Sequence, residues 1–411
     1  MSEPDIVLIR VSGADRPGIT AALTEVLGRY DVTILDIGQS VIHDTLSLGL
    51  LVLLPEEAAS CAVFRELLFA AHELGLTIRF TPVGSDDYEA WVAEQGRPRH
   101  IVTLLGRKLA AEHIARVARV VTDNGLNIER IDRLSGRISL REAGTAPQRE
   151  SVEIWLKGEV ADIAALHAEF LHLAQEMAVD IAIQEDDIFR RNRRLVCFDM
   201  DSTLIQVEVI DELARAAGVG EQVAEITEAA MRGELDFKES FRRRMALLRG
   251  MDESVLAEVA ARLPLTDGAE RLISTLKQLG YRIAILSGGF TYFAEHLKRR
   301  LGIDYVYANR LEFANGKLTG RVTGEVVDGQ RKAALLQEIA RKEGIRLEQV
   351  IAVGDGANDL PMLAIAGLGI AFHAKPLVKQ QARHAIATMG LDGILYLLGM
   401  RDEDLRRLAA E

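Results

Sequence analysis

The chain of 411 residues is longer than one ordinary domain, so two or three independent cores are expected. Its net charge of −12 argues against nucleic acid or an anionic membrane surface as a partner, since both attract a basic face. No apolar run could span a bilayer, no signal-peptide pattern begins the chain, and two cysteines imply no disulfide framework, so a cytoplasmic protein is expected.

The first half of the sequence repeats itself. The first copy should form a strand, a helix, two paired strands, a helix and a strand over residues 6–11, 15–28, 32–42, 46–54, 57–74 and 76–80. The second copy gives the same order over residues 100–105, 111–124, 126–134, 151–157, 162–177 and 179–183. This βαββαβ order predicts two ferredoxin-like domains, residues 1–83 and 100–185, joined by a polar linker over residues 84–99.

The turn of the first copy reads Asp15-Arg16-Pro17-Gly18. Pro17 suits the first turn of a helix, where its missing N–H costs nothing, and Gly18 lets a ligand approach the free amides of the helix start. This phrase within βαββαβ resembles the ACT domain, a small-molecule sensor often found on amino-acid-biosynthetic enzymes. The resemblance implies an amino-acid effector, with serine favoured, at Asp15 and Gly18.

The second copy departs from that phrase at the same turn. Gly106-Arg107-Lys108 keeps a glycine but loses the Pro-Gly turn, so Gly106 is the matching regulatory candidate and ligand binding there stays open. For both copies the alternative is a dimerisation module without ligand, because an open ferredoxin-like sheet has edges that pair with another copy. A homodimer through these domains is expected.

Residues 186–411 form a second pattern, in which apolar strands alternate with helices. After the strand at 195–198 the pattern predicts a helix at 267–279, a strand at 283–289, a helix up to residue 300 and a hairpin at 305–327. The helix of Lys332, a strand that ends in carboxylates at 350–359 and a last stretch at 369–372 follow. This order predicts an α/β domain with a doubly wound parallel sheet. Amphipathic helices over about 211–263 interrupt it directly after the first strand, so they should form a small helical cap that closes over the site.

Carboxylates end the first strand of this domain. Asp199 and Asp201 are two residues apart, so their side chains can point the same way and need a cation, for which Mg²⁺ is the natural choice. On its own D-x-D-x-T is more often an acidic turn that caps a helix through Ser202 or Thr203. Later stretches favour a phosphoryl-transfer site instead, because they add phosphate ligands, a fixed positive charge and further metal ligands. These are the Ser287 hydroxyl with the Gly288 and Gly289 amides, Lys332, and Asp355 with Asn358 or Asp359.

This ordered set resembles the haloacid dehalogenase superfamily, and within it the phosphoserine phosphatases. The resemblance covers about Arg193 to the C-terminus and implies that Asp199 attacks phosphorus while Asp201 acts as general acid and then base. It implies Mg²⁺ held by Asp199, Asp355 and the backbone carbonyl of Asp201. The implied substrate-binding residues are Glu208, Met231, Phe237, Arg244, Ser287, Gly288, Lys332 and Asn358.

Charge assigns two of these residues a part in recognition. A closed site for an amino-acid phosphate needs an anion for the ammonium, Glu208, and a cation for the carboxylate, Arg244, although the two could also form an ordinary surface ion pair. Three other functions stay open: hydrolysis of another small phosphate, a phosphotransferase or mutase that passes the phosphoryl group to an alcohol, and a non-enzymatic serine sensor with an inactive core.

Overall fold

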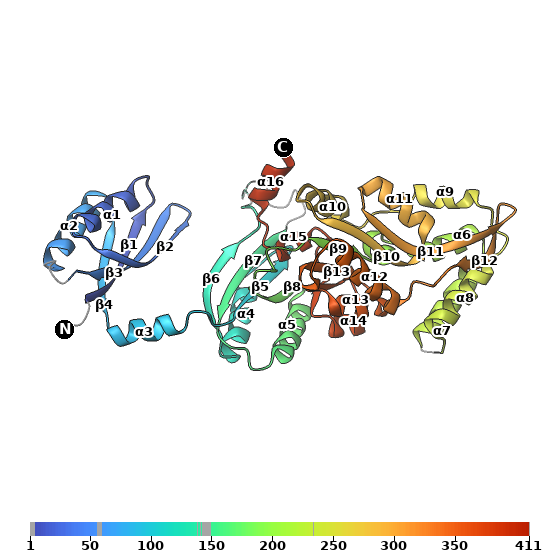
Figure 1. Cartoon of the computed structure of the whole chain (residues 1–411), viewed down its shortest axis with the longest axis horizontal. Coiled ribbons are helices and arrows are strands. Elements are labelled where there is room, and N and C mark those ends of the chain that lie inside the picture. Colours follow the sequence, from blue (N-terminus) through green and yellow to red (C-terminus); the bar gives the residue numbers. More distant parts are fainter. Residues whose placement is uncertain are drawn as a thin grey trace. The chain divides into compact units, whose positions relative to one another are not determined.

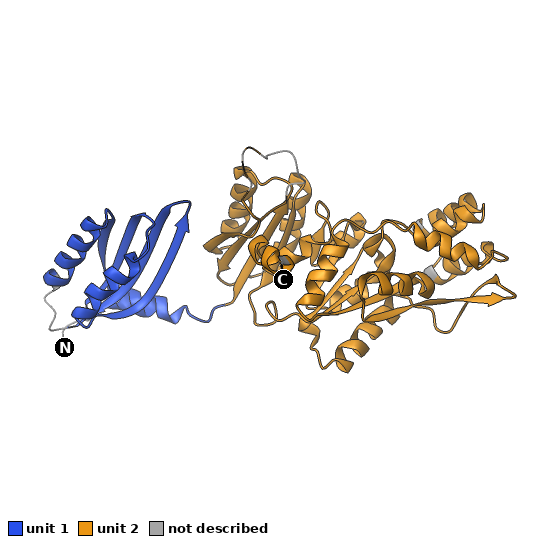
Figure 2. Ribbon diagram, turned by 90° about the horizontal axis from the view of Figure 1, so that it is seen from above, with its two compact units in different colours: residues 1–97 blue, residues 98–411 orange. Residues whose placement is uncertain are grey.

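The computed structural model describes residues 5–55, 60–137, 139, 141, 149–232 and 234–410. The chain divides into two compact units, residues 1–97 and 98–411 (Figure 2). The first βαββαβ domain forms the first unit, while the second one shares its unit with the α/β domain.

The first unit contains the predicted ferredoxin-like domain. Its elements are β1 Asp5–Ala14, α1 Ile19–Arg29, β2 Thr33–Ile42, β3 Thr45–Leu54, α2 Ser60–Glu73 and β4 Thr77–Val83. The strands form an antiparallel sheet of order β2-β3-β1-β4. Alternate residues of β3 are buried, because every second side chain faces α1 and α2, which pack against one face of the sheet (Figure 1).

The polar linker contains a helix that the sequence analysis did not predict, α3 Ser85–Ala93. Asp86 and Asp87 lie in its first turn, where negative charge is favourable at a helix start, and the helix buries none of its residues. The segment lacks an amphipathic pattern, which is the main sequence signal of a helix, so the helix was not predicted.

The second ferredoxin-like domain has the same order and belongs to the second unit. Its elements are β5 Arg99–Gly106, α4 Ala111–Asp123, β6 Asn127–Arg133, β7 Glu150–Lys157, α5 Ile163–Met177 and β8 Asp180–Glu185. The sheet order β6-β7-β5-β8 matches that of the first domain, so the predicted repeat is confirmed. Asp180 begins β8 and accepts hydrogen bonds from the backbone N–H groups of Ala387, Thr388 and Met389, which join this domain to the α/β domain.

A seven-stranded sheet of order β12-β11-β10-β9-β13-β14-β15 forms the α/β domain. Its strands are β9 Leu195–Phe198, β10 Arg282–Phe290, β11 Tyr305–Ala314, β12 Lys317–Thr323, β13 Val350–Gly354, β14 Leu368–Phe372 and β15 His384–Ile386. β9 is central and runs parallel to β10 and β13. Val196 and Phe198 pack on one face and Leu195 and Cys197 on the other, which explains the unbroken apolar run in the sequence.

Helices cover this sheet and form a cap beyond it. The cap consists of α6 Val209–Ala216, α7 Gly220–Met231, α8 Phe237–Leu247 and α9 Ser254–Ala261, as predicted, and α8 lies against β12 (Figure 1). The other helices are α10 Ala269–Gln278, α11 Thr291–Leu301, α12 Gly329–Lys342, α13 Leu360–Ile365, α14 Pro376–Gln381, α15 Gly393–Leu397 and α16 Asp402–Ala410. None of the helices in the described ranges has the length and apolar character needed to cross a membrane.

Candidate active site

Asp199 and Asp201 lie where the central strand ends. Asp199 directly follows β9; its N–H donates to the Val353 carbonyl (2.9 Å), and its Oδ1 accepts from the Met200 N–H (2.7 Å). The next residues form a short helical turn, Met200–Leu204, in which Ser202 has a left-handed φ of 55°. The turn carries Asp201 to the start of the cap, where its Oδ1 accepts from the N–H of Val209 in α6 (3.1 Å).

Lys332 supplies a fully buried positive charge beside Asp199. It extends from α12, and its Nζ lies 2.8 Å from Asp199 Oδ2 and 2.7 Å from Asp359 Oδ1. Burial alone would lower the pKa of Lys332, but the charges of Asp199 and Asp359 outweigh it and raise the pKa. Lys332 is therefore a cation that holds two carboxylates in place.

Three carboxylates gather at this point, those of Asp199, Asp355 and Asp359. One oxygen from each lies within 4.8 Å of the others, and Asp355 Oδ1 is oriented by a hydrogen bond from Thr203 Oγ1 (2.9 Å). Desolvation and the charge of Asp199 raise the pKa of Asp355 to about 8 and that of Asp359 to about 7. An all-oxygen donor set with excess negative charge fits a hard divalent cation such as Mg²⁺.

The sequence left open whether Asn358 or Asp359 completes the metal shell. The structure places Asp359 in the carboxylate cluster, with its Oδ2 accepting from the Gly356 N–H (2.9 Å). Asn358 is half-buried, and its side chain lies against Gly356.

The carboxyl end of β10 brings the predicted phosphate ligands to the same edge of the sheet. Ser287 is fully buried, and its Oγ accepts from the N–H of Gly289 (2.9 Å). The Gly288 carbonyl accepts from Asn309 Nδ2 (2.7 Å), so Asn309 fixes this strand end from the neighbouring strand β11. Any side chain at position 289 would collide with Asp201, which explains why glycine is needed there.

The cap adds an acid and a base near the carboxylates. Glu208 is exposed and accepts from Ser202 Oγ (2.8 Å); the surrounding protein and the charge of Asp199 raise its pKa. Arg244 is half-buried in α8. The charges of Glu208 and Asp211 favour its charged form, but desolvation outweighs them and lowers its pKa. Within the described ranges its buried Nε has no hydrogen-bond partner, so this N–H remains available to a ligand and is not occupied by an ordinary surface ion pair.

Two further substrate candidates, Met231 and Phe237, lie at the end of α7 and the start of α8. Their side chains lie outside the described part of the structure.

The regulatory candidates differ between the two ferredoxin-like domains. Gly18 precedes α1 with φ 91°, and both Gly18 and Asp15 are exposed, with no atom within 4 Å of where a Gly18 side chain would begin. Gly106 is closely packed, because a Cβ there would lie 3.2 Å from Val179 and 3.3 Å from Leu109. The turn is thus open in the first domain and filled in the second.

Comparisons with known proteins agree with this geometry. The family of haloacid dehalogenase-like hydrolases matches residues 196–364, and ACT domain families match residues 5–81 and 98–184. A phosphoserine phosphatase of Streptomyces coelicolor is 43% identical over 404 residues, which are 98% of this chain and 94% of the relative. The chain belongs to the phosphoserine phosphatase family.

Another relative and a solved structure extend the match. A phosphoserine phosphatase of Mycobacterium tuberculosis is 42% identical over 395 residues, 96% of this chain and 93% of the relative. The structure of a probable phosphoserine phosphatase from Vibrio cholerae has a TM-score of 0.58 at 36% identity and covers 76% of this chain and 90% of that chain.

Sequence reasoning missed several residues that support this site. Thr203 appeared only as a helix cap, and Asn309 was not singled out at all. Asn309 also accepts from the Val327 N–H (2.9 Å), so it ties the strand end at Ser287 to the segment before α12. Asn309 is 2% exposed, but it precedes Arg310 in a strand with several polar residues, so the sequence offered no clear signal for it.

Proposed function

We propose that this enzyme hydrolyses O-phospho-L-serine to L-serine and phosphate, the last step of serine biosynthesis, with Mg²⁺ and through an aspartyl-phosphate. The observation that carries the proposal is the position of Asp199, whose carboxylate touches Lys332 and belongs to a cluster with an excess of negative charge. A carboxylate and a phosphate are both anions and repel each other. Positive charge beside Asp199, from Lys332 and a bound cation, would allow the carboxylate to attack the phosphorus.

In the first step Asp199 attacks phosphorus, the P–O bond to serine breaks, and Asp201 gives its proton to the departing serine oxygen. Burial and the charges of Glu208 and Asp199 raise the pKa of Asp201 well above its ordinary value, so it can hold that proton near neutral pH. In the second step Asp201 takes a proton from the water that hydrolyses the aspartyl-phosphate. The Ser287 hydroxyl and Lys332 stabilise the phosphoryl oxygens throughout.

Asp199, Asp355 and Asp359 are the side chains that would hold Mg²⁺, with the backbone carbonyl of Asp201 as a further candidate. When bound, the ion neutralises the charge that accumulates between the carboxylates and the phosphoryl group. Asp359 also holds Lys332, so its share in metal binding is smaller than that of Asp355 if the ion pair persists.

Substrate choice is assigned to the cap. Glu208 would bind the ammonium of phosphoserine, and Arg244, with an unpartnered Nε, its carboxylate. Both side chains approach the carboxylate cluster from elements that follow Asp201, so closure of the cap would bring them onto the substrate.

Phosphate release from O-phospho-L-serine tests this proposal, with Mg²⁺ and after its removal by EDTA. We expect turnover only with the metal, and restoration when Mg²⁺ is added back. O-phospho-L-threonine, phosphohomoserine and a sugar phosphate form the matched panel, and faster release from any of them would overturn the substrate assignment. Formation of a new phosphate ester with an added alcohol would favour a phosphotransferase.

We also propose that serine binds at the open Asp15–Gly18 turn and lowers the activity. The turn leaves the N-terminal amides of α1 accessible to a carboxylate. Coupling of this kind is worth about 1 to 3 kcal/mol, so inhibition should be partial and saturable. Gly18→Ala should weaken the serine response, whereas Gly28→Ala, also exposed on α1, should not; an unchanged response in Gly18→Ala would leave simple product inhibition as the explanation.

A homodimer through the first domain is the remaining part of the proposal. β2 is an edge strand of its sheet and exposes apolar side chains, with Ile37 49% and Ile42 79% exposed. An exposed apolar edge is a common place for two copies to pair. Ile37→Lys should convert a dimer into a monomer in light scattering, and a dimer that persists would direct attention to another surface.

A further inference from the structure

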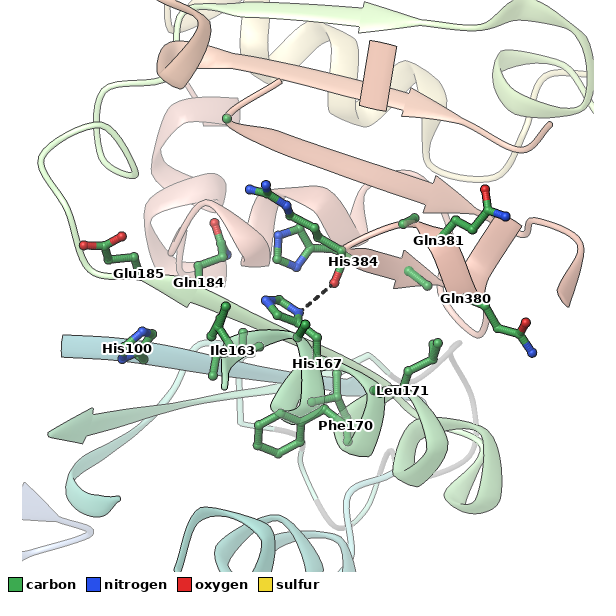
Figure 3. A pocket seen from close by; sticks show the side chains of 18 of the residues that line it. His100, Ile163, His167, Phe170, Leu171, Gln184, Glu185, Gln380, Gln381 and His384 are labelled. Atoms are coloured by element: carbon green, nitrogen blue, oxygen red, sulfur yellow. Dashed lines mark hydrogen bonds between the residues drawn. The ribbon is translucent and has the colours of Figure 1, made fainter. Parts of the chain in front are cut away.

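A cavity of about 890 Å³ lies between the second ferredoxin-like domain and the α/β domain (Figure 3). One wall comes from α5 and β8, and the other from α14 and β15. Glu348 and Gly367, which also line it, precede β13 and β14, so the cavity lies at the amino ends of strands whose carboxyl ends face the catalytic edge. The catalytic proposal does not use it.

Arg193 places a buried positive charge in this cavity. It is 7% exposed, and its guanidinium donates to the carbonyl oxygen of Glu348. In the described ranges no carboxylate forms an ion pair with it and its Nε has no partner, while Asp187 and Glu348 act on it from a greater distance. A buried guanidinium is costly without a counter-ion, which points to an anionic group in the cavity.

Two more side chains that are nine-tenths buried line the cavity and carry unpartnered atoms. His384 is 6% exposed and its Nδ1 has no partner among the described residues; its ring faces His167, with the centroids 5.6 Å apart (Figure 3). Gln184, also 6% exposed, donates an Nε2–H to the Leu397 carbonyl (2.9 Å), and its Oε1 accepts from no donor among the described residues. A molecule that satisfies both atoms must therefore offer a hydrogen-bond acceptor and a hydrogen-bond donor.

The remaining lining narrows the chemistry of the occupant. Glu185, Asp187 and Glu348 are among the lining residues, together with Arg383, so the cavity carries charges of both signs and does not favour a molecule with a large net negative charge. Ile163, Phe170 and other apolar side chains complete the wall (Figure 3). A small molecule with one carboxylate, one ammonium and an apolar part satisfies all these groups at once.

We propose that this cavity binds a free α-amino acid, with its carboxylate toward Arg193 and His384 and its ammonium toward Gln184 Oε1 and the acidic side chains. The site is separate from the Asp15–Gly18 turn, which belongs to the other compact unit. Because its two walls come from different domains, the bound amino acid bridges them, and it should raise the melting temperature of this unit.

Calorimetric titration of the full chain tests the assignment. The probes are glycine, L-serine, L-glutamine and L-leucine, together with 4-methylpentanoate and 3-methylbutylamine, which match leucine but each lack one charge. We expect at least one amino acid to bind, and each single-charge analogue to bind about tenfold or more weakly than leucine. Equal binding of leucine and 4-methylpentanoate would overturn the zwitterion assignment in favour of a simple anion site.

Variants assign the binding to this cavity. Ala164 is exposed and lines the cavity from α5, so Ala164→Phe should obstruct part of it and weaken this binding, while Ala165→Phe, on the next residue but outside the lining, is the matched control. Arg193→Gln should weaken binding about tenfold or more, and the Ala164→Phe and Ala165→Phe pair decides the matter if that variant does not fold. The binding must persist in Gly18→Ala. If no probe binds, or if Ala164→Phe binds every probe as the wild type does, the cavity holds solvent only.

Discussion

Two groups of acidic side chains are buried in the second unit, and they are paired very differently. At the interface between its domains Asp180 accepts from three backbone N–H groups and from Thr388 Oγ1, Glu153 pairs with Arg190, and Asp392 pairs with Arg149 and Arg271. At the catalytic edge Asp199 and Asp359 form ion pairs, within the described ranges, with Lys332 alone, and Asp355 forms none there.

This difference separates architecture from chemistry. The interface acids have their partners in the folded chain, so they stabilise the arrangement of the two domains. Lys332 compensates only part of the charge of the catalytic acids, and desolvation together with the charge of Asp199 raises the pKa values of Asp355 and Asp359. Substitutions in the two groups should therefore affect different quantities.

The sharpest test of the comparison is Asp199→Asn. Phosphate release should fall by about 10⁴-fold or more, because the nucleophile is lost. The melting temperature should stay near that of the wild type, since the asparagine oxygen can still accept from Met200 and Lys332 keeps Asp359. Normal hydrolysis by this variant would rule out the covalent mechanism.

Arg244→Ala examines whether the Arg244 guanidinium, whose Nε has no hydrogen-bond partner among the described residues, serves recognition. Loss of one partner from a desolvated charge pair costs about 2 to 5 kcal/mol, so activity on phosphoserine should fall roughly 30- to 5,000-fold. Activity on p-nitrophenyl phosphate, which lacks a carboxylate, should change little.

Arg243→Ala is the control for that variant, because Arg243 is exposed one residue away on α8 and pairs with Glu239. It should leave both activities unchanged. Equal losses on both substrates in Arg244→Ala would instead assign Arg244 to the chemistry or the fold.

The sequence predicted the strand ends that meet at the catalytic edge, but almost none of the interface. Asp199, Ser287 and Asp355 each end an apolar run, and parallel strands bring such ends together whatever the rest of the fold does. The choice between Asn358 and Asp359 could not be made, because it depends on the geometry of a single tight turn, Ala357–Asp359.

Interface partners lie far apart in the chain, and no local pattern pairs them. Asp180 and Thr388 are 208 residues apart, and the short strand β15 that presents this segment was not predicted. Its three residues give too little periodicity to separate a strand from a loop. The cavity beside β15 was also missed, because its walls come from segments that lie far apart in the sequence and meet only in the folded protein.

Asp180→Ala tests the interface side of the comparison. The substitution leaves three backbone N–H groups and the Thr388 hydroxyl without their acceptor, so the free energy of unfolding should fall by about 2 to 4 kcal/mol in urea denaturation. Turnover per folded molecule at 25 °C should change little. Asp123→Ala removes an exposed carboxylate at the end of α4 and serves as the control; unchanged stability in Asp180→Ala would mean that the interface is held elsewhere.

The two regions should also respond to pH with opposite signs. Burial lowers the pKa of His384 to about 3, with smaller effects of His167 and Arg383, so its folded state binds fewer protons than the unfolded chain. The stability that His384 contributes is therefore present above pH 6.5 and is lost as the pH falls. Asp355 and Asp359 have raised pKa values, so their unfavourable charge is relieved as the pH falls below about 8 and 7.

His384→Leu separates these opposing effects, because it removes the imidazole and leaves the catalytic edge untouched. Between pH 7 and pH 5 the wild type should lose about 2 kcal/mol more unfolding free energy than the variant, as expected for a group that titrates near 6.5 when unfolded and near 3 when folded. Denaturation of both proteins at the two pH values gives this double difference directly, and the contributions of the carboxylates cancel in it. Parallel pH profiles for the two proteins would show that His384 can accept a proton in the folded state, and that solvent or a ligand in the cavity compensates its charge.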